Sequence, residues 1–111
     1  MNTTALQNET SAKIAELNDA ARCNASNYMT TQGIMSLDEQ TISEIFVQVQ
    51  NFNKFNQDND PYGEHDFGAF TIDGDKVFWK IDYYDQGLNE WCDPLDPHYR
   101  RVVTVMLDED Y

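Results

Sequence analysis

Three consecutive residues, Glu64, His65 and Asp66, form the pattern in this chain that is most typical of a reactive site, and Asp60 precedes them closely. A histidine beside carboxylates can bind a metal ion or act as a base strengthened by the neighbouring negative charge. The alternative is a turn in which these polar side chains satisfy backbone groups. Strand geometry would also point residue 65 away from residues 64 and 66.

On the catalytic interpretation, the protein is a small metal-dependent or hydrolytic enzyme in which Tyr62 and Trp79 form the walls of a pocket. Its central residues would be Asp60, Glu64, His65 and Asp66. Glycine-rich phosphate loops and nucleophile elbows, which identify larger enzyme classes, do not occur in the sequence. The enzyme is therefore the second of two hypotheses.

Two familiar metal-binding patterns are incomplete in this chain. Asp58, Asp60 and Gly63 match the start of an EF-hand calcium loop, but Ala69 occupies its twelfth position, where a bidentate glutamate is required. The cysteines and histidines do not have the spacing of a zinc finger. They are Cys23, His65, Cys92 and His98. The sequence therefore predicts no metal ion and no cofactor.

Negative charge is the most unusual property of the composition. Seven basic residues against twenty acidic residues give a net charge of −13 in a chain of 111 residues. The excess is uneven, because residues 1–55 carry a net charge of −3 and residues 56–111 carry −10. Such a surface repels nucleic acids and anionic membranes and attracts basic partners. Direct binding to nucleic acid or to a membrane is not expected, although a need for solubility would also explain the acidity.

Carboxylates in the second half of the chain could form a row of fixed negative charge. Alternate residues of a strand lie about 6.6 Å apart on one face, which is comparable to the spacing of phosphates along a nucleic-acid strand. The predicted partner-binding residues are Asp73, Asp75, Asp82, Asp85, Glu90, Asp93 and Asp96. We expect these residues to line one rim, formed by a hairpin tip, a strand end and the loop that follows.

The first hypothesis is therefore a small, non-enzymatic inhibitor that mimics nucleic acid. It would bind the basic groove of a nucleic-acid-binding protein, such as a CRISPR effector complex or a restriction enzyme. Anti-CRISPR or anti-restriction proteins encoded by phages or mobile elements fit this description. An antitoxin-like or structural partner would use the same acidic face.

A β-hairpin must position most of these residues. Residues 67–72 and 76–84 are rich in β-branched and aromatic side chains, and Asp73 with Gly74 between them is typical of a type I′ turn. The second strand alternates, so that one of its faces should contact the core. That face comprises Val77, Trp79, Ile81 and Tyr83.

Two helices are indicated by apolar periodicity, over residues 9–23 and 36–53. Ser36 and Glu39 form a capping box at the start of the second helix. Its apolar stripe, which should face the sheet, comprises Ile42, Ile45, Phe46, Val49 and Phe52. The two helices should therefore pack on the same sheet.

Two further strands are expected at residues 28–32, where Gly33 ends the pattern, and at residues 100–107. The last strand is apolar on both faces, which indicates a central position in the sheet. An acidic loop, residues 85–97, should connect the hairpin to it.

The resulting order, α-β-α-β-β-β, predicts an α+β fold with a mainly antiparallel sheet of three or four strands and two helices on one face. Residues 1–8 should be frayed, and residues 9–111 should form a single domain. Two distant cysteines, the absence of a signal-peptide pattern and the absence of a long apolar run predict a reduced, soluble protein in the bacterial cytoplasm.

Several segments resemble a small bacterial family of unknown function. The most specific are residues 59–68 (NDPYGEHDFG) and residues 78–85 (FWKIDYYD). Further matching segments are Leu17-Asn-Asp19 with Arg22, Thr31-Gln-Gly33, Asp93-Pro94 with Asp96-Pro97, and Val103-Thr-Val-Met-Leu107 with Tyr111. The resemblance covers roughly residues 14 to 111 and weakens at residues 86–92. It implies a short standalone domain found in bacteria and mobile elements, with no established reaction.

Overall fold

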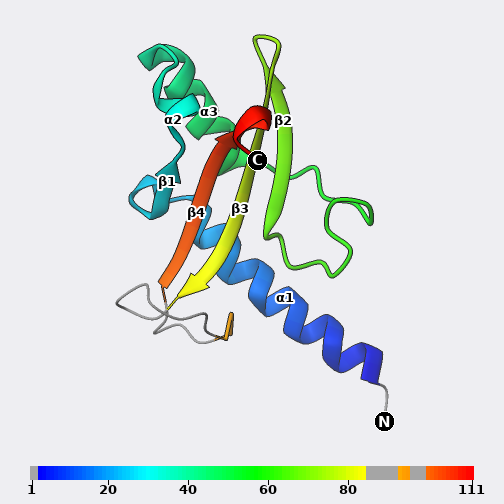
Figure 1. Ribbon diagram of the computed structural model, residues 1–111. Coiled ribbons are helices and arrows are strands. Elements are labelled where there is room, and N and C mark those ends of the chain that lie inside the picture. The colour runs from blue at the N-terminus through cyan, green and yellow to red at the C-terminus, as the bar shows by residue number, and fades with distance from the viewer. Residues whose placement is uncertain (1–2, 85–92, 96–99) are drawn as a thin grey trace.

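A four-stranded sheet forms the centre of the fold (Figure 1). The computed structural model describes residues 3–84, 93–95 and 100–111. The strands are β1 (Tyr28–Thr30), β2 (Phe67–Ile72), β3 (Asp75–Tyr84) and β4 (Arg100–Leu107). Their order across the sheet is β1-β4-β3-β2. The β4 strand pairs antiparallel with β3 and parallel with β1, so it occupies the central position that its apolar faces predict.

Helices cover one face of this sheet. In Figure 1, α3 (Glu39–Asn51) lies behind the sheet, and the C-terminal part of α1 (Thr3–Arg22) passes behind β4 and β3, while its N-terminal part extends beyond the sheet. The connections between α1, β1 and α3 contain a short 3-10 helix, η1 (Ala25–Asn27), and the short helix α2 (Gln32–Met35). A second 3-10 helix, η2 (Asp108–Asp110), follows β4. The α+β architecture is confirmed, and α2 and the 3-10 helices are additions to the expected order. Within the described part of the chain, no helix is long and apolar enough to cross a membrane.

The core lies between the helices and the sheet face that the alternation of β3 predicts. The predicted residues Val77, Trp79, Ile81 and Tyr83 are all buried. They form one cluster with inward residues of β4, α2 and α3, which include Val103, Val105, Ile34, Ile45 and Val49. Each large apolar side chain that becomes buried contributes roughly 1.5–3 kcal/mol, so this layer is the main source of stability.

The hairpin between β2 and β3 has the turn that its sequence predicts. Asp73 and Gly74 both have positive φ angles, 49° and 86°, which are the left-handed conformations that a type I′ turn requires. Ile72 pairs with Asp75 across this turn. The turn therefore fixes the register that places Trp79 in the core.

Helix boundaries differ from the expected ones. The α1 helix begins at Thr3, where fraying was expected up to residue 8. The cap of α3 is Asp38, whose side chain accepts a hydrogen bond from the Thr41 amide, and the predicted capping box at Ser36 does not form. Ser36 instead ends α2, a short helix that contains Gly33. Asp38 replaces Ser36 as the cap because the chain completes an extra helical turn first.

Candidate functional site

The segment that links α3 to β2 contains the predicted reactive residues and folds as a turn around Asp60. This carboxylate is only 7% exposed and accepts hydrogen bonds from the backbone amides of Glu64 and His65, at 3.0 and 3.1 Å. His65 has a positive φ of 55°. A non-glycine residue adopts that conformation when its surroundings hold it there. The backbone of this segment is therefore a turn whose amides are satisfied by a polar side chain, as the alternative to a reactive site predicts.

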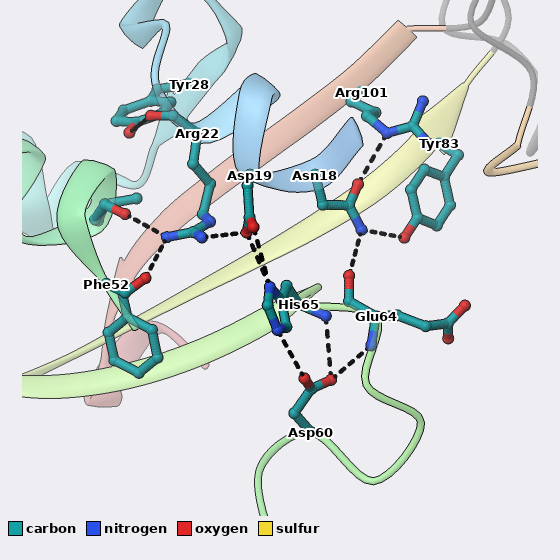
Figure 2. A network of polar contacts seen from close by, with 11 residues as sticks. Asn18, Asp19, Arg22, Tyr28, Phe52, Asp60, Glu64, His65, Tyr83 and Arg101 are labelled. Carbon is teal, nitrogen blue, oxygen red and sulfur yellow. Dashed lines mark hydrogen bonds and ion pairs between the residues drawn. The ribbon is translucent and has the colours of Figure 1, made fainter. Parts of the chain in front are cut away.

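The imidazole ring of His65 lies between two carboxylates (Figure 2). Its Nδ1 atom is 3.0 Å from Asp19 Oδ1, and its Nε2 atom is 3.7 Å from Asp60 Oδ2. The ring also stacks on Phe55, with 3.9 Å between centroids and 4° between planes. Both ring nitrogens therefore face carboxylates of the protein itself.

Arg22, at the end of α1, joins this histidine to α3. The side chain is buried, and its Nη1 atom donates to the carbonyl oxygens of Val49 and Phe52 at 2.9 and 3.0 Å. Those carbonyls lie at the C-terminal end of α3, where acceptors lack helical partners and the helix dipole favours positive charge. The Nη2 atom contacts Asp19 Oδ1 at 2.6 Å, and the guanidinium lies 4.7 Å from the centroid of Trp79.

Asn18 joins the same turn to the sheet. The side chain is fully buried, and its amide nitrogen donates to the carbonyl oxygen of Glu64 at 3.0 Å and to the Tyr83 hydroxyl at 2.9 Å. Its amide oxygen accepts a hydrogen bond from Arg101 Nε at 2.8 Å. Burial raises the pKa of Tyr83 to about 12, so the phenol remains neutral at physiological pH.

We call this set of residues the polar cluster; it comprises Asn18, Asp19, Arg22, Asp60, His65 and Arg101. It connects α1, α3, the 52–66 segment and the sheet through buried hydrogen bonds and ion pairs. Such a network rigidifies a fold because most of its buried polar groups have specific partners. Within the described residues, Arg22 Nε and Arg101 Nη2 are buried without a hydrogen-bond partner. Its geometry is that of a cross-link between elements.

The predicted catalytic set is only partly brought together. Asp60 and His65 meet, whereas Tyr62 is 76% exposed and Trp79 is fully buried in the core, so these two do not form the walls of one pocket. Among the described residues, no three histidine, cysteine, aspartate or glutamate side chains are grouped closely enough to hold a metal ion.

Sequence reasoning missed the α1 members of the polar cluster, Asn18, Asp19 and Arg22. A signal was available, because Asn18 and Arg22 continue at intervals of four from Ile14, which is buried. Residues four apart lie on the same side of a helix. Polar residues on the inward side of an amphipathic helix indicate buried partners elsewhere in the chain.

Two carboxyl groups beside the polar cluster, those of Glu64 and Asp66, have raised pKa values. Burial raises the pKa of Glu64, and the nearby Asp66 and Asp60 raise it further. Burial also raises the pKa of Asp66, with smaller contributions in the same direction from Asp60 and Asp82. Both groups are partly solvated, so the energies involved are small.

A raised pKa in the folded state means that protonation of these carboxyls favours folding. Their contribution to stability is complete below the ordinary carboxyl pKa of about 4 and is lost as the pH rises through the raised values. We expect the double variant Glu64→Gln, Asp66→Asn to be more stable than wild type at pH 7, by up to about 1 kcal/mol. Urea unfolding at pH 7 and pH 5 would measure this gain, which should shrink at the lower pH. A gain that grows on acidification would contradict the prediction.

The predicted acidic rim is not a single row in the described part of the chain. Asp73 and Asp75 lie at the hairpin tip, whereas Asp82 lies near the other end of β3, where its carboxylate pairs with Lys80 at 3.3 Å. A strand rises about 3.3 Å per residue, so the full length of the hairpin separates these positions. Asp93 is exposed beyond the end of β3. Asp85, Glu90 and Asp96 are outside the described residues.

The hairpin tip instead has acidic neighbours from the C-terminal segment. Leu107 pairs with Val77, so η2 follows β4 directly alongside the start of β3. A hollow of about 280 Å³ lies there and is lined by Gly74, Asp75, Lys76, Leu107, Asp108 and Glu109. We call Asp73, Asp75, Asp108 and Glu109 the acidic end; all four are exposed. The predicted partner-binding residues do not include Asp108 and Glu109.

The fold and the site define a small α+β domain with an internal polar cross-link and a strongly acidic surface. The chain belongs to the family described as a protein of unknown function (DUF3768), which matches residues 30–110. No curated protein and no solved structure matches the chain significantly. The expected membership of an uncharacterised family is thereby confirmed, and this membership assigns no reaction.

Proposed function

We propose that this protein is a non-enzymatic inhibitor that binds the basic, nucleic-acid-binding surface of another protein. A CRISPR effector complex or a restriction enzyme in the bacterial cytoplasm has the kind of groove that would suit it. The carboxylates of the acidic end take the place of phosphates in that groove. Phages and mobile elements are the expected source of such an inhibitor.

The observation that supports this proposal most directly is the unequal distribution of basic and acidic side chains between the interior and the surface. Two of the seven basic residues, Arg22 and Arg101, are buried and contact groups within the protein. Asp60 is the one buried acid among the described residues. The surface is therefore even more acidic relative to its remaining bases than the sequence suggests, and that acidity is free to act on a partner.

The acidic end provides a rigid platform for this charge. Asp75 lies at the start of a sheet strand, and Asp108 and Glu109 lie on the 3-10 helix beside it. Charges on ordered backbone lose less conformational freedom on binding than charges on a flexible tail. Lys76 is the one base that lines this hollow, and its ammonium group lies 5.2 Å from the ring centroid of Phe78.

Charge reversal at the acidic end is expected to weaken binding to the target by at least about a hundredfold. Close charge pairs across an interface are worth roughly 1.5 kcal/mol or more each, and reversal replaces attraction with repulsion. The test variant changes Asp75, Asp108 and Glu109 to lysine. A matched control changes Glu9, Glu16 and Asp58, which are also exposed, and therefore has the same net charge.

The measurement begins with capture of a basic protein from a bacterial lysate on immobilised wild-type protein at low salt. Affinity for the captured protein is then compared between the variants and from about 50 to about 500 mM salt. We expect the control to bind as wild type does and salt to weaken binding steeply. Equal binding by the acidic-end variant, or binding that is insensitive to salt, would refute the proposal.

A further inference from the structure

The β2 strand forms one edge of the sheet, and its outer side is open. It pairs with β3 alone, since the strand order ends at β2. The Ile81 amide donates to the Asp66 carbonyl, which fixes the alternation of the ladder. Residues 68, 70 and 72 then direct their amides and carbonyls toward β3, and Phe67, Ala69 and Thr71 direct theirs outward. Within the described residues, no backbone hydrogen bond from another segment reaches these outward groups.

An apolar groove runs beside this open edge, between β2 and α3. One part, of about 540 Å³, is lined by α3 residues and by Ile72. The adjoining part, of about 260 Å³, is lined by the C-terminal end of α3 and by Phe70. Both parts share Val47 and Gln48, so the groove is continuous along the strand. Val47 is 53% exposed, although it lies on a helix whose neighbouring apolar residues are buried.

We propose that this groove binds an extended, basic peptide segment of a partner protein, which adds to the sheet as a strand beside β2. The outward groups of Phe67, Ala69 and Thr71 would form the main-chain hydrogen bonds. Alternate side chains of the peptide would enter the groove against Val47 and Phe70. A free sheet edge with a helix-lined pocket is the arrangement that strand addition requires.

Charge decides between a basic peptide and a second copy of this chain. Glu44 lines the part of the groove next to Ile72, and Asp73 follows Ile72 directly at that end. The one base among the lining residues, Lys54, lies in the other part, beside Phe70. Two copies paired through β2 would each bring a net charge of −13 to the contact, which opposes association. An antiparallel peptide places its N-terminal residues beside Asp73. Basic residues at that end of the peptide would therefore be complementary to the site.

The inference goes beyond the proposed function, because its backbone hydrogen bonds and apolar contacts lie at β2 and α3, and only Asp73 belongs to both surfaces. The charge-reversal variant of the acidic end keeps Asp73 unchanged. The two ideas can therefore fail separately. The acidic-end variant should still bind a peptide at β2, and a variant blocked at β2 should keep the salt-sensitive contacts of the acidic end.

The probe is a synthetic peptide with two N-terminal lysines followed by alternating valine and threonine. We expect it to slow amide hydrogen exchange at Phe67, Ala69 and Thr71 in the isotope-labelled protein, with the signals followed by NMR. Thr71→Pro removes an outward amide without breaking the ladder to β3 and should weaken binding at least tenfold. Thr71→Val keeps the amide and should bind as wild type does.

A second variant keeps the test valid if proline disturbs the fold. Val47→Asp changes an exposed side chain of the groove and should also weaken peptide binding at least tenfold. Failure of the peptide to protect the three amides would overturn the proposal. Wild-type affinity for the peptide in both Thr71→Pro and Val47→Asp would also overturn it. Protection of the same amides by self-association, without peptide, would identify a second copy as the occupant and would also overturn it.

Discussion

Replacement of Arg22 by alanine is expected to lower the free energy of unfolding by about 3–5 kcal/mol. The buried guanidinium donates to two carbonyls at the end of α3 and pairs with Asp19. Without it, the buried Val49 carbonyl and the partly buried Phe52 carbonyl lose their charged donor, and the contact with Trp79 is also lost. The three effects add because they concern different partners of one side chain.

Two control variants separate the loss of contacts from the loss of charge. Lys13→Ala removes the same charge from the outer side of α1, where the ion pair with Glu16 is well exposed, and should change stability by less than about 0.5 kcal/mol. Arg22→Lys keeps the charge but cannot reach two carbonyls and a carboxylate in the same planar geometry. It should fall between wild type and alanine. Urea unfolding followed by circular dichroism would measure all three, and a near-wild-type midpoint for Arg22→Ala would show that the polar cluster does not stabilise the fold.

The sheet and α3 could be predicted because local sequence determines them. The Asp73-Gly74 turn fixes the hairpin register, and the alternation of β3 identifies its buried face. The apolar stripe of α3 likewise identifies the residues that face the sheet. These patterns have short periods, so they can be recognised without knowledge of which segments meet.

The polar cluster could not be predicted in the same way, because its members come from distant parts of the chain. Asn18 contacts Tyr83 and Arg101, and Asp19 contacts His65. Which polar group meets which depends on how α1 crosses the sheet, and no local pattern specifies that crossing. The Glu64-His65-Asp66 pattern is typical of a reactive site in the sequence. In the fold, its histidine contacts Asp19 and Asp60 and stacks on Phe55.

Within the described residues, the carboxylates of the predicted acidic rim do not share one edge of the sheet, for a geometric reason. Residues close in sequence along a hairpin, such as Asp75 and Asp82, are separated by most of the length of an extended strand. Asp75 and Glu109 are distant in sequence but adjacent in the fold, because β3 and β4 pair in antiparallel register. A charged surface on a sheet protein therefore follows strand pairing more closely than sequence order.

Replacement of Gly68 by valine is expected to destabilise the protein by about 3 kcal/mol, because Gly68 lies directly opposite Trp79 in the β2–β3 ladder. A Cβ atom at this position would lie 2.4 Å from Nε1 of the indole ring, which is closer than atoms can approach. The ring cannot move away easily, since Phe52 and Phe55 pack edge-to-face against it and Arg22 lies over it. Close packing in a protein core leaves no space for the additional atoms.

The neighbouring residue provides a matched control. Ala69→Val adds the same branched side chain to the same strand, but on the other face of the sheet, where Ala69 is partly exposed and pairs with Phe78. We expect a change within about 0.5 kcal/mol, because valine suits strands and meets no buried ring. In thermal unfolding, Gly68→Val should lower the Tm by more than about 10 °C. Similar Tm values for the two variants would show that Trp79 does not lie against Gly68, and the packing of Arg22 on that ring would then also be wrong.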